Sequence, residues 1–157
     1  MKIIGKPTIN PILFYTGKIS GYTTWILFIL SFNNLIDISM IYFIPLRWVS
    51  FFILGLGLIF TIFSMINLGK STTLGLPEKD TVFKNNGLYK VSRNPMYVGF
   101  NLLTIASALF IQNIFILFAG IYSIGIYHLI ILSEEKFLAN RFGSKYIEYK
   151  AKVRRYI

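Results

Sequence analysis

Two polar stretches of opposite charge stand at the two ends of the longest apolar run in this 157-residue chain. Arg93 and Asn94 come directly before Pro95, where the run begins, and Glu134 and Glu135 follow its last residue. A helix start beside an arginine suits an anion such as a carboxylate, while paired acids suit a cation. If the chain brings the two stretches together, they can hold a zwitterionic or cationic ligand between them.

A helical hairpin is the arrangement that would bring them together. The uncharged run is too long for one membrane-crossing helix, which needs about 20 residues. Its one polar interruption is Gln112-Asn113, so we predict helices over residues 95–111 and 114–133 joined by a tight turn. The first helix then starts on the side where the second one ends.

The residue types at the start of this hairpin support a helix beginning there. Proline is favoured at the first helical position because its missing N–H is not needed there, and Asn94 before it is a good N-cap. Arg93 adds positive charge to the positive end of the helix dipole. We therefore expect residues 93–95 to form an anion-accepting corner.

The acids at the hairpin's other end are in an unfavourable place for negative charge, because the helix dipole is negative there. Glu134 and Glu135 therefore need cations, and Arg93 and Lys136 are candidates. Two interpretations remain open: an interfacial salt-bridge cluster, or a ligand site. Charged groups at membrane depth are costly enough to suggest a function.

The tail "EEKFLANRFGSKYIEYKAKVRRYI" predicts a helix that continues past the apolar run and breaks at Gly143, followed by a short basic amphipathic helix. This second helix could lie on the membrane surface or fold back over the site as a lid. Its buried side is expected to comprise Phe137, Phe142, Tyr146, Tyr149 and Val153.

Composition indicates an integral membrane protein of the all-α class. The chain is 55% hydrophobic and 14% charged, and further uncharged runs predict spans over residues 22–36 and 48–68, which makes four with the hairpin. There is no cysteine, which excludes disulfides, thiolate catalysis and cysteine-ligated metals. The one histidine, His128, is more readily explained as a hydrogen-bonded interior residue than as a ligand, so we expect no metal.

The basic residues set the expected orientation. With four spans, all 16 of them except Arg47 fall on the side of the two termini and the 69–94 loop, and the positive-inside rule makes that side cytoplasmic. The net charge of +10 then flanks the spans, where it attracts anionic lipid headgroups, and does not indicate nucleic acid.

The segment "GLYKVSRNPMYVG", followed some 35 residues later by the acidic pair and its tail, resembles the superfamily of isoprenylcysteine carboxyl methyltransferases and phospholipid methyltransferases. The likeness covers roughly residues 70–157, including the hairpin. It implies an integral membrane enzyme that uses S-adenosylmethionine. We expect one domain over 1–157, with N-terminal spans in 1–69 and the cofactor-binding loop, hairpin and C-terminal helix in 70–157.

The resemblance also assigns site residues. It implies cofactor contacts by Tyr89, Asn94, Pro95, Met96, Tyr97, Glu134 and Glu135. Residues 81–84 match a further cofactor-contacting strip loosely, and Asn94 stands where the carboxyl methyltransferases usually have histidine. For catalysis, Arg93 would steer a carboxylate or thiolate nucleophile, and an acid, Glu134 or Glu135, would accept a proton from an amine, with Glu134 as the expected catalytic residue.

We therefore expect an S-adenosylmethionine-dependent methyltransferase acting on a membrane lipid or small hydrophobic acceptor, with its site in the cytoplasm. One alternative is a non-enzymatic membrane scaffold or transporter subunit, which would need a polar pathway at mid-depth. Spans two and three offer only Thr61, Ser64, Asn101, Thr104 and Ser107 for this. A sterol-reductase-like enzyme, a second alternative, normally needs a larger bundle.

Overall fold

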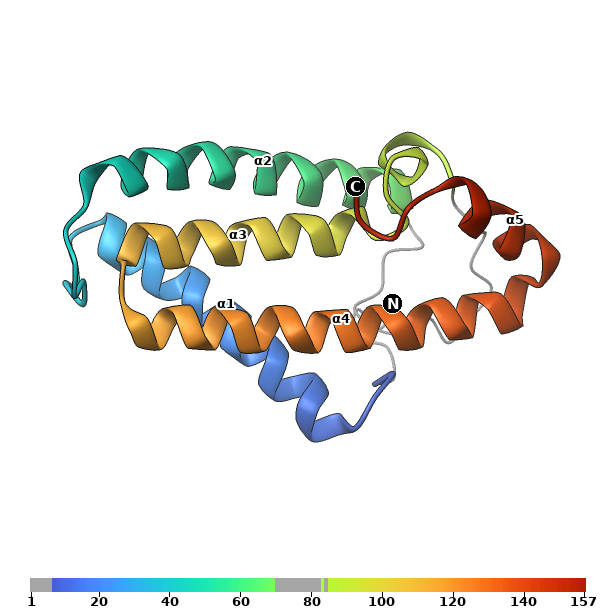
Figure 1. Cartoon of the computed structure of the whole chain (residues 1–157), viewed down its shortest axis with the longest axis horizontal. Helices are drawn as coiled ribbons and strands as arrows, with labels where there is room; N and C mark the ends of the chain where they lie inside the picture. The colour runs from blue at the N-terminus through green and yellow to red at the C-terminus, as the bar shows by residue number, and fades with distance from the viewer. Residues whose placement is uncertain (1–6, 70–82, 84) are drawn as a thin grey trace.

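The computed structural model describes residues 7–69, 83 and 85–157, and within these ranges the chain is all-helical. The helices are α1 (Pro11–Phe32), α2 (Ile44–Leu68), the short 3-10 helix η2 (Gly87–Lys90), α3 (Pro95–Ile111), α4 (Ile114–Phe142) and α5 (Ser144–Lys152). Figure 1 shows α2, α3 and α4 along the length of the molecule, with α1 crossing them.

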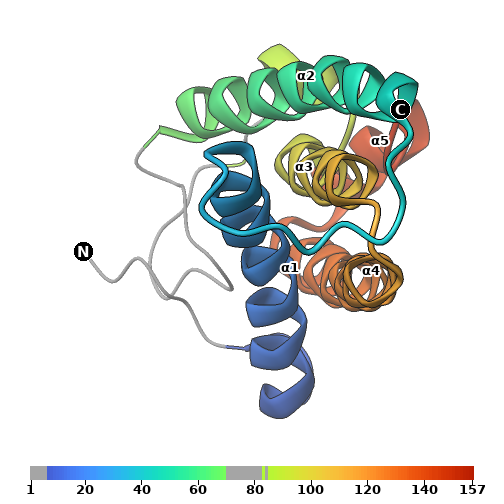
Figure 2. The same cartoon turned by 90° about the vertical axis from the view of Figure 1, so that its left-hand side faces the viewer.

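Helix α3 is the centre of the bundle, since it contacts α1, α2 and α4. In Figure 2, α3 and α4 are seen end-on beside each other, while α1 and α2 run across the view. The main core cluster joins α1, α3 and α4 next to the start of α3. It consists of Phe14, Met96, Tyr97, Phe100, Ile126, Tyr127, Ile130 and Ile131.

The hairpin prediction is confirmed to the residue at the turn. Helix α3 ends at Ile111 because Gln112 adopts a left-handed conformation (φ 54°, ψ 46°), and Asn113 caps α4 by accepting from the N–H of Phe115 at 2.9 Å. Gln112 also exchanges hydrogen bonds with both backbone groups of Phe43 at 2.8 and 2.9 Å. The turn thereby fixes the loop between α1 and α2.

The boundaries of the first two spans differ from the prediction, because both helices begin earlier and α1 ends at Phe32, before the predicted residue 36. Helix α1 begins at Pro11 after an Asn10 cap, whereas the predicted span starts at residue 22. Lys18 had indicated a boundary, but it lies within the helix, 7% exposed, with its ammonium 4.1 Å from the centre of the Phe14 ring. Helix α2 begins at Ile44 and therefore includes Arg47 in its first turn.

Helix α2 packs through small residues and exposes its large ones. Its buried residues are Ser50, Gly57 and Ser64, one every seven positions, whereas Phe52 and Ile66 are 71% and 66% exposed. Large apolar side chains outside and small ones inside are the arrangement expected of a helix that faces lipid. By length and composition, α2 and α4 can each cross a membrane, and α3 is a shorter apolar helix.

Two glycines allow this close packing. A Cβ on Gly99 of α3 would collide with the Thr61 hydroxyl and lie 2.7 Å from the Thr61 nitrogen on α2. A Cβ on Gly21 of α1 would lie 2.6 Å from the Ser123 hydroxyl on α4. At both glycines the neighbouring helices approach more closely than a residue with a Cβ atom would allow.

Candidate active site at the start of α3 and the end of α4

Glu135 binds the two ends of the site together. Its side chain is 5% exposed and pairs with Arg93 at 2.9 Å and with Arg155 at 3.0 Å. Arg93 adds a second hydrogen bond through Nε at 3.1 Å. The prediction that Arg93 is a cationic partner of the acids is thus confirmed for Glu135. The second cation is Arg155 and not the predicted Lys136, which is exposed.

Asn94 holds the N-cap position before Pro95, as predicted, but its side chain does not cap the helix. Its amide Nδ2 instead donates to Glu135 Oε1 and to the carbonyl oxygen of Arg155, both at 3.2 Å. The charge-assisted hydrogen bond to the carboxylate orients the amide with Nδ2 toward Glu135, and the amide oxygen accepts no N–H group at the start of α3. The prediction of side-chain capping was therefore wrong, and Asn94 belongs to the ion-pair cluster.

Arg93 also fastens the C-terminal tail to the start of α3. Its Nη1 donates to the carbonyl oxygens of Val153 at 2.6 Å and Lys150 at 3.2 Å, and its backbone N–H donates to the carbonyl of Arg154 at 2.9 Å. The guanidinium is 7% exposed, so nearly all its donors face protein acceptors. Arg93 is a structural junction of three segments.

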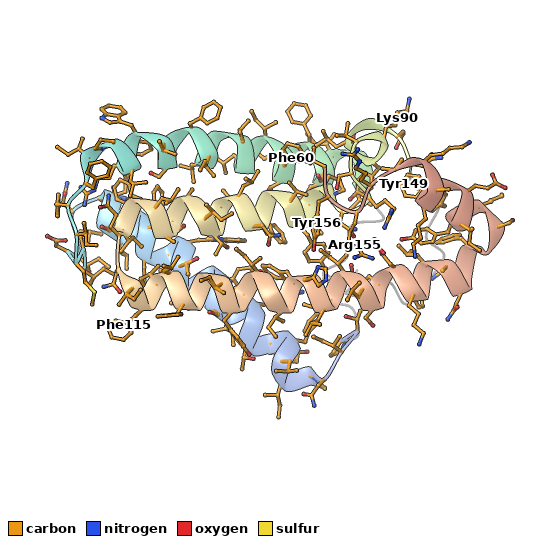
Figure 3. The ribbon with its side chains drawn as sticks, viewed as in Figure 1. Phe60, Lys90, Phe115, Tyr149, Arg155 and Tyr156 are labelled. Carbon is orange, nitrogen blue, oxygen red and sulfur yellow. The ribbon has the colours of Figure 1, made fainter. Side chains whose placement is uncertain are left out.

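Of the two arrangements considered for the tail, the structure has the fold-back. Helix α4 ends at Phe142, Gly143 has a positive φ of 53°, and α5 returns toward η2. The Tyr149 hydroxyl donates to the Tyr89 carbonyl at 2.6 Å. In Figure 3, Tyr149, Arg155 and Tyr156 lie together near the start of α3, far from Phe115 at the other end of α4.

The tail's buried side is formed mainly by its tyrosines. Tyr146 and Tyr149 are buried, and both contact the Phe83 ring at centroid distances of 6.1 and 5.3 Å. Burial raises the pKa of Tyr146 to about 12, and the negative charge of Glu135 adds to the rise. Phe137, Phe142 and Val153 are only half-buried, so the predicted face is confirmed in part.

The carboxylate of Glu134 has different partners from that of Glu135. Its Oε1 accepts from the Tyr97 hydroxyl at 2.8 Å, and it attracts the ammonium of Lys18 on α1. Its other carboxylate oxygen has no hydrogen-bond partner in the part of the chain that the structure describes. Glu134 is half-buried, and this second oxygen is left as an acceptor for a further donor.

The structure gathers all the residues predicted for the site at this end of the bundle: Tyr89, Arg93, Asn94, Pro95, Met96, Tyr97, Glu134 and Glu135. Pro95 and Met96 are buried, so they shape the site from within. Residues 81–84 lie outside the described residues, apart from Phe83. The sequence prediction did not include Arg155 or Lys18, although "KVRRYI" carried a signal in its two adjacent arginines.

His128 matches its predicted interior role, with Nδ1 2.6 Å from the hydroxyl of Tyr156, although it is half-buried. No group of three histidine, aspartate or glutamate residues within residues 7–69 and 85–157 is arranged to hold a metal ion.

The comparison with protein families adds to this geometry. The model of the family described as phospholipid methyltransferase matches residues 45–145, which is most of the chain. The chain belongs to the phospholipid methyltransferase family. Searches of curated proteins and of solved structures found no match.

Family membership points to a membrane methyltransferase. The match covers α2, η2, α3 and α4, and so includes the Arg93–Glu135 pair and the Tyr97–Glu134 pair. Lys18, whose ammonium attracts Glu134 from α1, and Arg155, which pairs with Glu135 from the tail, lie outside the matched range.

Proposed function

We propose that the chain transfers a methyl group from S-adenosylmethionine to a lipid-like or small hydrophobic acceptor at the meeting point of α3 and α4. The observation that carries the proposal is the position of Glu134, which receives one hydrogen bond from Tyr97 at 2.8 Å and keeps an oxygen available. It stands beside a second glutamate that is already neutralised. The family match supports the reaction class.

The donor and acceptor set suits this cofactor. When bound, S-adenosylmethionine supplies a methyl group on a positively charged sulfur. Glu134 can accept from the cofactor's ammonium, and the first N–H groups of α3 can donate to its carboxylate. Tyr89 and Tyr97 are buried next to this corner, and their rings could lie against a sulfonium bound there. Asn94, Pro95, Met96 and Glu135 are proposed to complete the cofactor site by shaping and fixing it.

Proton removal is the remaining chemical task when the acceptor is an amine. The cofactor held at this corner would supply the methyl group, its sulfur would keep the electron pair of the broken carbon–sulfur bond, and the methylated nitrogen would lose a proton. Glu134 can take the proton that the nitrogen loses, either directly or through Tyr97. The helices contribute mainly by holding both reactants in line.

For Arg93 we propose positioning as its main role. Its donors already engage Glu135, Val153 and Lys150, so steering a carboxylate or thiolate nucleophile would require breaking those bonds. A rigid Arg93 instead fixes the tail against the corner where the cofactor would sit.

The proposed topology has four spans, α1 to α4, with both termini and the site in the cytoplasm. At about 1.5 Å per residue, α3 with 17 residues is about 25 Å long, which is shorter than the usual hydrocarbon core of about 30 Å and requires the bilayer to be thinner around it. The basic residues on the cytoplasmic side would contact anionic lipid headgroups. Because the chain has no cysteine, single cysteines introduced at Asn34 and Lys90 can test this directly by labelling from either side of the membrane.

Calorimetric titration of the purified protein with S-adenosylmethionine tests the proposal. We expect saturable binding that Glu134→Gln weakens, and radioactive methyl transfer from the labelled cofactor to an extractable membrane lipid or small molecule. Absence of binding in several detergents and in lipid nanodiscs would overturn the proposal and favour a scaffold or transporter subunit.

A further inference from the structure

A second polar site lies at the far end of α3 from Arg93, where the 33–43 loop meets the start of α2. A cavity of about 500 Å³ is present there. Its lining includes two charged residues, Asp37 and Arg47, and five aromatic ones, Phe32, Tyr42, Trp48, Phe51 and Phe110. Figure 1 shows this end, with the 33–43 loop, opposite to the end that holds the C-terminus.

Arg47 is the basic centre of this cavity. Its guanidinium lies between two aromatic rings, 4.0 Å from the centre of Tyr42 and 4.9 Å from that of Phe110. Its Nη2 donates to the Ser39 hydroxyl at 3.2 Å, but its Nε is buried without a partner. Among the described residues, no carboxylate pairs with Arg47. A buried guanidinium donor is costly without an acceptor, so the site is suited to an anion from outside.

Asp37 supplies the opposite charge in the same cavity. One of its carboxylate oxygens accepts from the Ser39 backbone N–H at 3.2 Å, and the side chain is exposed. Ser39 thus binds both charged side chains: its backbone N–H donates to Asp37, and its hydroxyl accepts from Arg47. A ligand with a negative group for Arg47 and a positive group for Asp37 matches this pair.

The rim of the cavity is apolar and exposed. Phe32, Ile44 and Trp48 line it and are 53%, 63% and 71% exposed, and they continue into the exposed apolar face of α2. Tryptophan and other aromatic residues are typical of the level where lipid headgroups meet acyl chains. The rim therefore favours a ligand with apolar chains over a free ion.

We propose that this cavity binds the headgroup of a zwitterionic aminophospholipid, with the phosphodiester at Arg47, the ammonium toward Asp37 and the acyl chains along α2. The site is about 25 Å from the Arg93 corner, the length of the 17-residue helix α3. It is separate from the methyl-transfer site, and in the proposed topology it borders the opposite leaflet. The binding does not depend on catalysis.

The fluorescence of Trp48 reports on ligand binding in the cavity, because Trp48 lines the cavity whereas the other tryptophan, Trp25, does not. The full chain in maltoside micelles is titrated with dihexanoylphosphatidylethanolamine while tryptophan fluorescence is recorded. Dihexanoylglycerol, which lacks the phosphate, and inorganic phosphate are the comparison ligands. We expect saturation with the phospholipid and much weaker binding of both comparison ligands.

Two variants assign the charges. Arg47→Gln should weaken phospholipid binding about tenfold or more, as the loss of a charge-assisted hydrogen bond predicts. Asp37→Asn, at an exposed position, should weaken the ethanolamine lipid but not dihexanoylphosphatidylglycerol, which has no ammonium. Arg154→Gln removes the same charge from an exposed position at the other end of the molecule and should leave binding unchanged.

The result that overturns the proposal is equal phospholipid affinity in the wild type and Arg47→Gln. Inorganic phosphate binding as tightly as the phospholipid would also overturn it, in favour of a free anion. If Arg47→Gln loses its helical circular dichroism, the test rests on Asp37→Asn alone. An equal loss of affinity for the ethanolamine and glycerol phospholipids in that variant would then contradict the paired-charge site.

Discussion

Arg93 and Glu135, 42 residues apart in the chain, form a buried ion pair of 2.9 Å that joins the start of α3 to the end of α4. Arg155 closes the pair from the tail at 3.0 Å. The adjacent acid, Glu134, takes no part in this cluster and binds Tyr97 instead. Two consecutive glutamates thus have different tasks: one holds the protein together, and the other is available to a ligand.

This division predicts opposite effects for the two matched substitutions. Glu135→Gln leaves two guanidinium groups without their carboxylate and should lower the free energy of unfolding by about 3–5 kcal/mol. Glu134→Gln keeps an oxygen that accepts from the Tyr97 hydroxyl, so it should change the free energy of unfolding by about 1 kcal/mol or less. It should nevertheless weaken the binding of S-adenosylmethionine. Reversible unfolding in mixed micelles and calorimetry measure the two effects. Equal stability losses would contradict the division.

Tyr97→Phe isolates the hydroxyl that binds Glu134. Tyr97 is 5% exposed within the core, so truncation to alanine would create a cavity and confuse packing with function. The phenylalanine variant should remain within about 1.5 kcal/mol of wild-type stability and lose roughly tenfold in cofactor affinity or methyl transfer.

Tyr122→Phe is its control, because it removes another hydroxyl between α4 and α1, bonded to Thr16 at 2.8 Å and remote from the site. If both variants lose the same amount of cofactor affinity, the Tyr97 hydroxyl has no specific role.

Gly99→Ala should destabilise the bundle where α2 and α3 touch. The added methyl group meets Thr61 and the Gly57 carbonyl at 2.9 Å, and relieving such a clash costs about 1–3 kcal/mol. Gly125→Ala in α4 has open space around its Cβ and should be neutral or stabilise by up to about 1 kcal/mol through helix propensity. Thermal unfolding of the two variants side by side gives the comparison.

Stability should fall at alkaline pH as Tyr146 ionises. Burial raises its pKa to about 12 in the folded state, against an ordinary value near 10. Between about pH 10 and pH 12 the unfolded chain therefore loses this proton before the folded chain does, and the free energy of unfolding decreases as pH rises.

Tyr146→Phe should reduce that slope, because phenylalanine has no hydroxyl to ionise. Tyrosinate absorbance and unfolding measured across the same pH range check the prediction. An identical slope in the wild type and Tyr146→Phe would contradict it.

Local signals predicted the hairpin well. A proline, a left-handed glutamine and a capping asparagine fix its helix ends, and each acts within a few residues. The start of α1 was missed because Lys18 resembled a flanking charge, whereas it is buried beside Phe14 and near Glu134. Which acid pairs with which cation depends on how α1 and the tail pack. Arg155 therefore could not be paired with Glu135 from spacing alone.

The closure of the cluster by Arg155 sets an order for assembly during synthesis. Glu135 is added to the growing chain 20 residues before Arg155, and Arg93 is added long before both. At roughly 5–20 residues per second, this interval lasts on the order of one to four seconds. Until Arg155 has been made, Arg93 is the only one of the two guanidinium partners of Glu135 that exists, and the tail cannot yet cover the corner where α3 begins. The tail closes that corner only after all four long helices have been made.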